Sequence, residues 1–333
     1  MVKCRPSSRA SALGHIGPRS ERRLPRGERT GSHRSKGECA RAAPCVISPT
    51  VRDLIIEGLK FIAPLSVALI VFAQALGISP SGVVAFFRDR PLVMLRSLVA
   101  ALVLVPAAAL GLILVLKPAP AVAIGLAILV ACPPAPLMIK AATQKGGDAA
   151  FMASLHLSLA ALAFVTVPAV LQALAAPLGF SADIDPVSLL SILAKTILVP
   201  IGLGLAARAL FPAWADRLAA PLGKIGSRGL LVVVIAIAGV LFRALLTMDL
   251  WSYVVIATVA VAALGVGHLM IGAQYSDKRT VLAVECAVRH PGLAIAIGTT
   301  NFTAQQTLPV LVPCIITFMV IANVYLFMRA RKE

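Results

Sequence analysis

Residues 279–302 read RTVLAVECAVRHPGLAIAIGTTNF, an apolar run that Arg-His-Pro-Gly interrupts near its centre. Residues 119–143, APAVAIGLAILVACPPAPLMIKAAT, form a similar run that Cys-Pro-Pro-Ala-Pro interrupts. Proline has no backbone N–H and its ring clashes with the carbonyl four residues earlier, so each run predicts two half-helices with a break between them. In hydrocarbon the backbone groups freed at a break need partners inside the protein, which makes both breaks candidate functional sites.

The composition of the whole chain is that of a membrane protein. Hydrophobic residues make up 59% of the 333 residues and charged residues only 14%, which excludes an ordinary soluble domain. Because about 20 apolar residues span the hydrocarbon, residues 54–333 predict an all-α membrane protein with about nine transmembrane helices, which we expect not to be an enzyme. The predicted helices are 59–77, 92–116, 119–144 (broken), 149–175, 187–209, 222–246, 251–273, 279–302 (broken) and 308–328.

Residues 1–53 form a basic N-terminal extension whose composition differs from the rest. The extension is rich in Arg, Ser and Gly and has no apolar run long enough to be buried, which predicts disorder. It also lacks the apolar core of a secretory signal. We expect no nucleic-acid partner, since aromatic residues are not interleaved with the basic ones. No Met occurs between Met1 and Met94, so we also hypothesise a translation start at another codon, such as that of Val46 or Val51.

The distribution of Lys and Arg predicts how the chain is oriented, because cytoplasmic loops carry the excess of positive charge. Placing the C-terminal Arg329, Arg331 and Lys332 inside also places most other loop cations inside. We therefore expect an integral membrane protein, in a bacterial inner membrane, with a cytoplasmic C terminus and an external N terminus. The two broken helices hold matching positions if the first four helices correspond to the last four. That arrangement is typical of an inverted-repeat transporter with crossing broken helices and a binding site at the breaks.

Ionisable side chains lie at the predicted breaks, where charge is costly and therefore points to function. Glu285 and Arg289 are spaced i, i+4, so they can pair on one helix face or simply neutralise each other. Lys140 either reaches the same centre or snorkels to the membrane surface. We expect a substrate or ion site that consists of Glu285, Arg289, His290, Lys140, Pro134 and Pro291.

Cysteine and histidine residues outside this set have simpler explanations. Cys132, beside the first break, could bind a soft metal or arsenite, but cysteine is also a small apolar filler, which we favour. We expect His156 and His268 to be core histidines whose hydrogen bonds are satisfied. The sequence therefore predicts no metal site made from these side chains.

These motifs resemble those of the bile acid:sodium symporter superfamily, of which the chain looks like a divergent bacterial-type member. Residues 131–133 (ACP) followed by 145–148 (KGGD) are similar to its broken fourth helix and the next turn. Residues 279–294 are similar to its broken ninth helix. The resemblance covers residues 60–330 and implies the ten-helix fold of that family, with the first helix absent here.

The resemblance also implies sodium ligands, most of which this chain lacks. Glu285 matches the family's glutamate, but the Gln-Asn pair of the family is replaced by Arg289 and His290. Three further ligand positions carry side chains that offer no oxygen, namely Ala101, Met138 and Ile139. Because sodium needs several oxygen ligands, we expect neither family sodium site to persist, and we expect no other cofactor. A fixed cation, Arg289 or Lys140, is the simplest substitute for the ion.

Together these observations predict a secondary active transporter of a small, anionic organic solute that works without sodium. Arg289 and Lys140 would be its cationic partners, and Glu285 would be a counter-ion or proton carrier. Two alternatives remain open: an arsenite-type efflux permease that uses Cys132, and a non-transporting membrane sensor or scaffold. Besides the solute, membrane lipid is the expected partner. The sequence leaves the substrate, the direction of transport, the coupling ion and the oligomeric state open.

Overall fold

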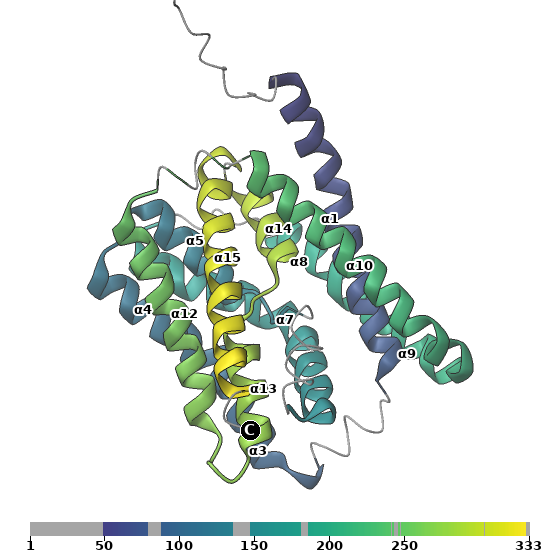
Figure 1. Cartoon of the computed structure of the whole chain (residues 1–333). Coiled ribbons are helices and arrows are strands. Elements are labelled where there is room, and N and C mark those ends of the chain that lie inside the picture. The colour runs from purple at the N-terminus through teal and green to yellow at the C-terminus, as the bar shows by residue number, and fades with distance from the viewer. Residues whose placement is uncertain are drawn as a thin grey trace, which may run out of the picture. The chain divides into compact units, whose positions relative to one another are not determined.

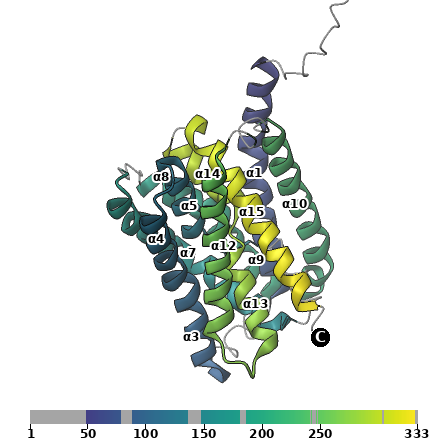
Figure 2. The same cartoon turned by 60° about the vertical axis from the view of Figure 1, so that its left-hand side comes forward.

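The structure is a computed structural model that describes residues 49–78, 88–135, 147–180, 186–240, 242, 246, 248–302 and 304–330. In these ranges the regular elements are helices, as predicted, and no strand is present (Figures 1 and 2). Two of them, η1 and η3, are short π-helices. The elements are α1 (Pro49–Gly77), α3 (Pro91–Val99), η1 (Ala100–Leu104), α4 (Val105–Leu116), α5 (Pro120–Ala131), α7 (Ala149–Leu178), α8 (Pro186–Leu193), η3 (Ala194–Leu198), α9 (Val199–Leu210), α10 (Pro212–Val240), α12 (Leu250–Met270), α13 (Ser276–Ala287), α14 (Pro291–Asn301) and α15 (Ala304–Ala330).

Six of the described helices, with adjoining α and π segments counted as one, are long and apolar enough to cross a membrane. They are Pro91–Leu116, Ala150–Leu178, Val187–Leu210, Pro212–Ala236, Leu250–Met270 and Thr307–Ala330. Phe61–Gly77 and Pro120–Ala131 are apolar but shorter. Each predicted range overlaps a described helix, while the count of nine transmembrane helices and the inverted repeat stay predictions.

Two helices begin ten residues earlier than predicted. Helix α1 begins at Pro49 instead of residue 59, and α10 begins at Pro212 instead of residue 222. Hydropathy detects only the part of a helix that lies in hydrocarbon, whereas the first turns of α10 carry charged residues such as Asp216 and Arg217. Residues 1–48 of the predicted extension lie outside the described residues.

Helices α1, α9 and α10 pack against one another, as Figures 1 and 2 show. Glycines allow this close approach. A Cβ atom at Gly226 would lie 2.7 Å from Ile70 Cγ1, and one at Gly204 would lie 2.6 Å from Ala75 Cβ. Both distances are shorter than a van der Waals contact, so a side chain at either position would force the helices apart.

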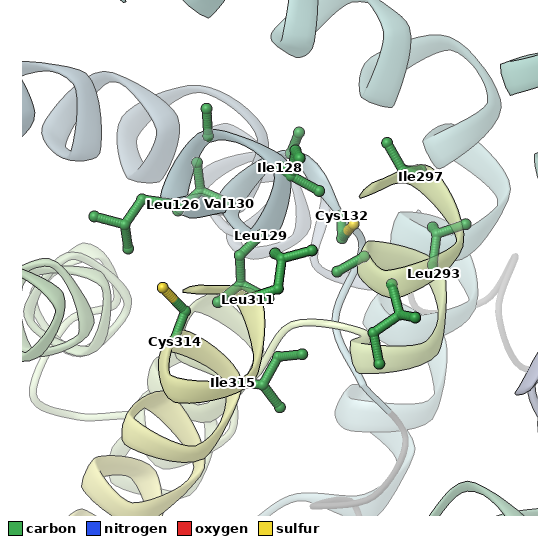
Figure 3. Close-up of a cluster of buried hydrophobic side chains, with 14 of the residues drawn as sticks. Leu126, Ile128, Leu129, Val130, Cys132, Leu293, Ile297, Leu311, Cys314 and Ile315 are labelled. Atoms are coloured by element: carbon green, nitrogen blue, oxygen red, sulfur yellow. The ribbon is translucent and has the colours of Figure 1, made fainter. Parts of the chain in front are cut away.

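A second group of helices surrounds the two breaks. Helix α12 packs against α4, α13 and α15, while α5 packs against α7, α14 and α15. The end of α5 contributes Leu129 and Cys132 to a buried apolar cluster that also contains Leu293 of α14 and Leu311 of α15 (Figure 3). Helix α14 contacts α1 as well, so the break that precedes it lies where the two groups of helices meet.

Candidate functional site

The second broken helix is interrupted where the sequence predicts. Helix α13 ends at Ala287, Val288 has an extended backbone (φ −87°, ψ 104°), and α14 begins at Pro291. Helix α5 ends at Ala131, and Cys132 is likewise extended (φ −65°, ψ 148°). The half-helix predicted after the first break lies outside the described residues, as do three predicted site residues in it: Met138, Ile139 and Lys140.

The two breaks lie side by side and pair in an antiparallel manner. An isolated β-bridge joins Pro134 and Arg289. The His290 N–H donates to the Pro133 carbonyl over 2.9 Å, and the Ala135 N–H donates to a carbonyl of the second break over 2.9 Å. Each break therefore supplies partners for backbone groups that the other break has freed from helical bonding.

The contacts of Arg289 converge on this crossing. Its guanidinium group donates to three backbone carbonyls: Nε to Cys286 over 3.0 Å, and the two terminal nitrogens to Cys132 over 3.1 Å and to Ala101 over 3.2 Å. Only 3% of Arg289 is exposed. The three acceptors belong to the two breaks and to η1, so one side chain connects three interrupted segments.

The Ala101 carbonyl is free to accept this bond because of a proline. In η1 the Val105 N–H bonds to the Ala100 carbonyl, five residues back, and not to Ala101. The next residue, Pro106, has no N–H with which to continue the π-helical pattern. Ala101 therefore receives neither the α-helical nor the π-helical bond, and its carbonyl turns to Arg289. The sequence prediction treated Ala101 only as a lost side-chain ligand, whereas its backbone oxygen takes part.

The other two carbonyls lose their helical donors in the same way. The α-helical partner of the Cys132 carbonyl would be the N–H of residue 136, which is a proline and has none. The partner of the Cys286 carbonyl would be the His290 N–H, which bonds to Pro133 instead. The breaks thus expose backbone oxygens inside the protein, and Arg289 satisfies one from each break.

Glu285 pairs with a residue to which the sequence prediction gave no functional role. Its carboxylate oxygens lie 3.1 Å and 3.3 Å from Nδ1 of His156 on α7, and both side chains are buried. No ion pair joins Glu285 to Arg289 among the described contacts, because α13 ends at Ala287 and the i, i+4 relationship needs an unbroken helix. The sequence does contain a signal for this pairing: His156 is an isolated ionisable residue in the apolar run 149–175, and ionisable groups at membrane depth tend to pair.

His290 stands at the N-terminus of α14. Its Nδ1 accepts a hydrogen bond from the Leu293 N–H over 3.4 Å, so a neutral imidazole carries its proton on Nε2. Nε2 is buried, and within the described part of the chain it has no hydrogen-bond partner. The neighbouring Gly292 is bordered by Val67 of α1 and Leu230 of α10. His290 therefore holds an unused donor close to the α1 and α10 helices, where a ligand could accept it.

The cysteines beside the breaks are buried. Cys132 and Cys286 both have free thiols and no measurable exposure. In the described residues, no group of three or more His, Cys, Asp or Glu side chains could hold a metal ion. His268, on α12, bonds through Nδ1 to the hydroxyl of Tyr325 over 2.8 Å, away from the crossing.

An ion pair joins the beginnings of α7 and α13. Lys278 Nζ lies 2.7 Å from the Asp148 carboxylate, which also accepts the Phe151 N–H over 2.9 Å and so caps α7. Burial raises the pKa of Asp148, but the bonds from Lys278 and Phe151 outweigh burial and hold this pKa below its ordinary value. The ion pair therefore holds Asp148, which follows the first broken helix in the sequence, next to Lys278 at the start of the second broken helix.

An open apolar groove of about 350 Å³ lies away from the breaks, against α1, α9 and α10. Phe72, Phe211 and Trp214 line it, and its other lining side chains are apolar too. None of the predicted site residues contributes to it. The groove therefore offers no charged side chain to an anionic solute.

Comparison with known proteins places these features in context. A family model described as Sodium Bile acid symporter family matches residues 64–248, which is more than half of the 333 residues. The matched range contains η1 and the first break, while Glu285, Arg289 and His290 follow it in the sequence. No curated protein matches the chain.

Proposed function

The chain belongs to the sodium bile acid symporter family, and from that premise we propose that it is a secondary transporter of a small organic anion that needs no sodium. The family and the apolar helices make it a membrane transporter. The solute would bind at the crossing of the two breaks, where α14 meets α1. The inverted repeat would relate the two broken helices and allow the crossing to open to either side in turn.

The buried guanidinium of Arg289 is the observation that carries this proposal. Its described contacts are backbone carbonyls, whereas the carboxylate of Glu285 bonds to His156. A carbonyl has a dipole but no net charge, so the positive charge of Arg289 lacks a carboxylate in contact with it. A small anion that enters the crossing would supply the missing negative charge.

Two further features favour an anion over a neutral or cationic solute. Helix α14 begins at the break, and the N-terminus of a helix carries a partial positive charge. His290 adds a buried donor beside that terminus. Lys140 would add a second cation from the other broken helix.

The residues at the predicted sodium-ligand positions fit a sodium ion poorly. The side chain of Ala101 offers no oxygen, and neither do those of Met138 and Ile139. Three carbonyls that could have bound an ion accept hydrogen bonds from Arg289. Since each oxygen lone pair spent on the guanidinium is lost to a metal, sodium coupling at this crossing is not part of the proposal.

We further propose that the cytoplasmic side is the end where α3 and α13 begin and α15 ends. Arg90 lies 5.4 Å from the centre of the Tyr275 ring, and Arg329 Nε donates to Thr280 Oγ1 over 3.1 Å. Figures 1 and 2 show the C-terminal end of α15 near α13. Lys278 of α13 lies 5.9 Å from the centre of the same Tyr275 ring, so basic side chains at the ends of three elements gather here, which favours the cytoplasmic side. Digestion of a C-terminal tag in inside-out but not right-side-out vesicles would support this orientation.

Uptake into proteoliposomes tests the proposed function. The purified protein, reconstituted in sodium-free choline buffer, is offered labelled organic anions, with neutral and cationic solutes as controls. We expect protein-dependent flux of at least one anion, and a loss of roughly tenfold or more in His290→Ala, because a buried donor to a charged ligand is removed. His268→Ala, which removes a histidine away from the crossing, should keep most of the flux. Binding of an anion without flux would support a sensor or scaffold instead.

A further inference from the structure

We propose that the apolar groove of α1, α9 and α10 binds an acyl chain of an anionic phospholipid, and that basic side chains of α10 bind the headgroup of this lipid. These side chains are Arg217, Lys224 and Arg228, which form the basic row of α10. The proposed transport of an anion does not require such a site. Lipid binding is also measured without transport, so its test is independent of the proposed function.

The groove has a lining that suits a hydrocarbon chain. Its volume is about 350 Å³, and its lining residues are apolar, among them Phe72 of α1, Ala207 of α9 and Leu218 of α10. Trp214 also lines the groove and is 66% exposed. Tryptophan is enriched where the hydrocarbon of a membrane meets the headgroups. Trp214 therefore indicates that the groove reaches the level of the headgroups.

The basic row lies beside the groove on the same helix. At about 3.6 residues per turn, the spacing of Arg217, Lys224 and Arg228 places all three on one face of α10. The same geometry places Trp214 and Leu218 on the adjoining face. All three basic side chains are exposed. Helix α10 thus presents an apolar strip next to a row of cations, a pattern typical of helices that contact anionic lipid.

The charges of the basic row lack a counter-ion among the described residues. Asp216 is the acidic residue nearest in sequence, but its carboxylate pairs with Arg208 of α9. Residues 66–77 of α1, which pack beside the first half of α10, contain no acidic residue. Lysine and arginine form strong hydrogen bonds with phosphate oxygens. A phospholipid headgroup would therefore supply the negative charge that the neighbouring helices do not.

Part of the basic row lies where water alone is a poor partner. Lys224 and Arg228 fall within the range 222–246 that hydropathy assigns to the hydrocarbon. Exposed apolar side chains, Ile225 and Leu231, lie near them on α10. A cation at this depth is costly unless its side chain reaches the headgroups. The excess of basic residues also favours the cytoplasmic side, whose leaflet carries anionic lipid.

A second copy of the chain fits this surface less well than a lipid does. In a twofold dimer the same surface of each copy meets its equivalent, so the two basic rows would lie close together. Like charges repel, and Asp216 already pairs within its own chain. An anionic phospholipid matches both the apolar groove and the positive charge beside it.

Two lipids and a pair of charge variants test the headgroup part of the site. The purified full-length protein in detergent is titrated with phosphatidylglycerol, which is anionic, and with phosphatidylcholine of the same acyl chains, which has no net charge. Native mass spectrometry gives the affinities, and thermal unfolding gives the stabilisation. The variant Arg217→Gln/Lys224→Gln removes two charges of the basic row. The control Arg88→Gln/Arg96→Gln removes two exposed arginines that lie elsewhere in the sequence.

A second pair of variants tests the acyl-chain part. Ala207→Phe places a large side chain in the groove, whereas Ala206→Phe places the same side chain on an exposed position of α9 that does not line the groove. Both substitutions keep the charge of the protein. We expect Ala207→Phe to weaken the binding of both lipids and Ala206→Phe to weaken neither.

We expect phosphatidylglycerol to bind more tightly than phosphatidylcholine and to raise the unfolding temperature of the unaltered protein by more. The affinity of Arg217→Gln/Lys224→Gln for phosphatidylglycerol should fall roughly thirtyfold, which corresponds to about 1 kcal/mol for each lost cation. The control Arg88→Gln/Arg96→Gln should keep the affinity of the unaltered protein. Higher salt should weaken the binding of phosphatidylglycerol, because exposed charges are screened.

Four outcomes would overturn the proposal. Equal affinity for the two lipids would exclude a headgroup site, and equal losses in the two charge variants would show that any loss of positive charge suffices. Equal stabilisation by glycerol phosphate, which has no acyl chain, would show an anion site without a role for the groove. A dimer that Ala207→Phe dissociates and Ala206→Phe does not would show that a second copy of the chain occupies the groove.

Discussion

The backbone N–H of His290 donates a hydrogen bond to the carbonyl of Pro133 over 2.9 Å, and this bond joins two helix breaks that are far apart in the sequence. In an unbroken helix the same N–H would bond to Cys286. By turning to Pro133 it frees the Cys286 carbonyl, which Arg289 then takes. One exchange of backbone partners thus joins the two breaks and provides one of the carbonyl acceptors of Arg289.

The buried pair of His156 and Glu285 should show strong coupling in a double-mutant cycle. His156→Ala leaves a buried carboxylate without its partner, which we expect to cost about 3–5 kcal/mol of unfolding free energy. Removing both side chains should cost less than the sum of the two single changes, by about 1–3 kcal/mol. Unfolding in mixed detergent micelles measures these values. Strictly additive losses would contradict a direct interaction between the two residues.

Gly267 should tolerate no side chain, because α12 touches the backbone of α13 there. A Cβ atom at this position would lie 2.6 Å from the Leu282 carbonyl oxygen and 2.7 Å from Ala283 Cα. We expect Gly267→Ala to lower stability by about 1–3 kcal/mol and to reduce uptake, because α13 leads into the second break. Gly265→Ala on the same helix meets nothing within 4 Å and is the matched control. Equal effects of the two substitutions would exclude this explanation.

Acidification should weaken the link between α7 and α13. The pKa of Asp148 is held below its ordinary value, so its contribution to stability is complete above about pH 4 and is lost as the pH falls through the lowered pKa. The unfolding temperature of Asp148→Asn should therefore lie below that of the unaltered protein at neutral pH, and the difference should shrink in acid. Asp89→Asn, which changes an exposed carboxylate, is the control. A difference that stays constant with pH would contradict the assignment.

Pro106 should affect uptake because it lacks the backbone N–H that would otherwise bond to the Ala101 carbonyl. Pro106→Ala restores an N–H that can continue the helical ladder and compete with Arg289 for the Ala101 carbonyl. We expect uptake to fall severalfold while the protein remains folded. Pro200→Ala is a matched control, since Pro200 follows the π-helix η3 in the same way but away from the crossing. A larger loss of uptake in Pro200→Ala would argue against the role given to Ala101.

The sequence predicts the backbone of this site better than the partners of its side chains. Proline identifies both interruptions, because a missing backbone N–H acts locally. No ion pair joins Glu285 to Arg289 in the described residues, since the spacing rule that allows one assumes a helix that continues past Ala287. His156 is buried and hydrogen-bonded, as predicted, but its partner Glu285 was not predicted, because it lies on another helix at a contact that only the tertiary fold creates. The role of the Ala101 carbonyl was missed because every residue has a backbone oxygen, so the residue type does not show which oxygen accepts a bond from a side chain.

The sodium dependence of uptake tests the central claim most directly. Initial rates for the unaltered protein in proteoliposomes are compared in choline and in sodium buffer, with the membrane potential clamped by potassium and valinomycin. Since Arg289 already supplies the cation at the crossing, the rates should be equal within error. Uptake that occurs only with sodium would contradict the account.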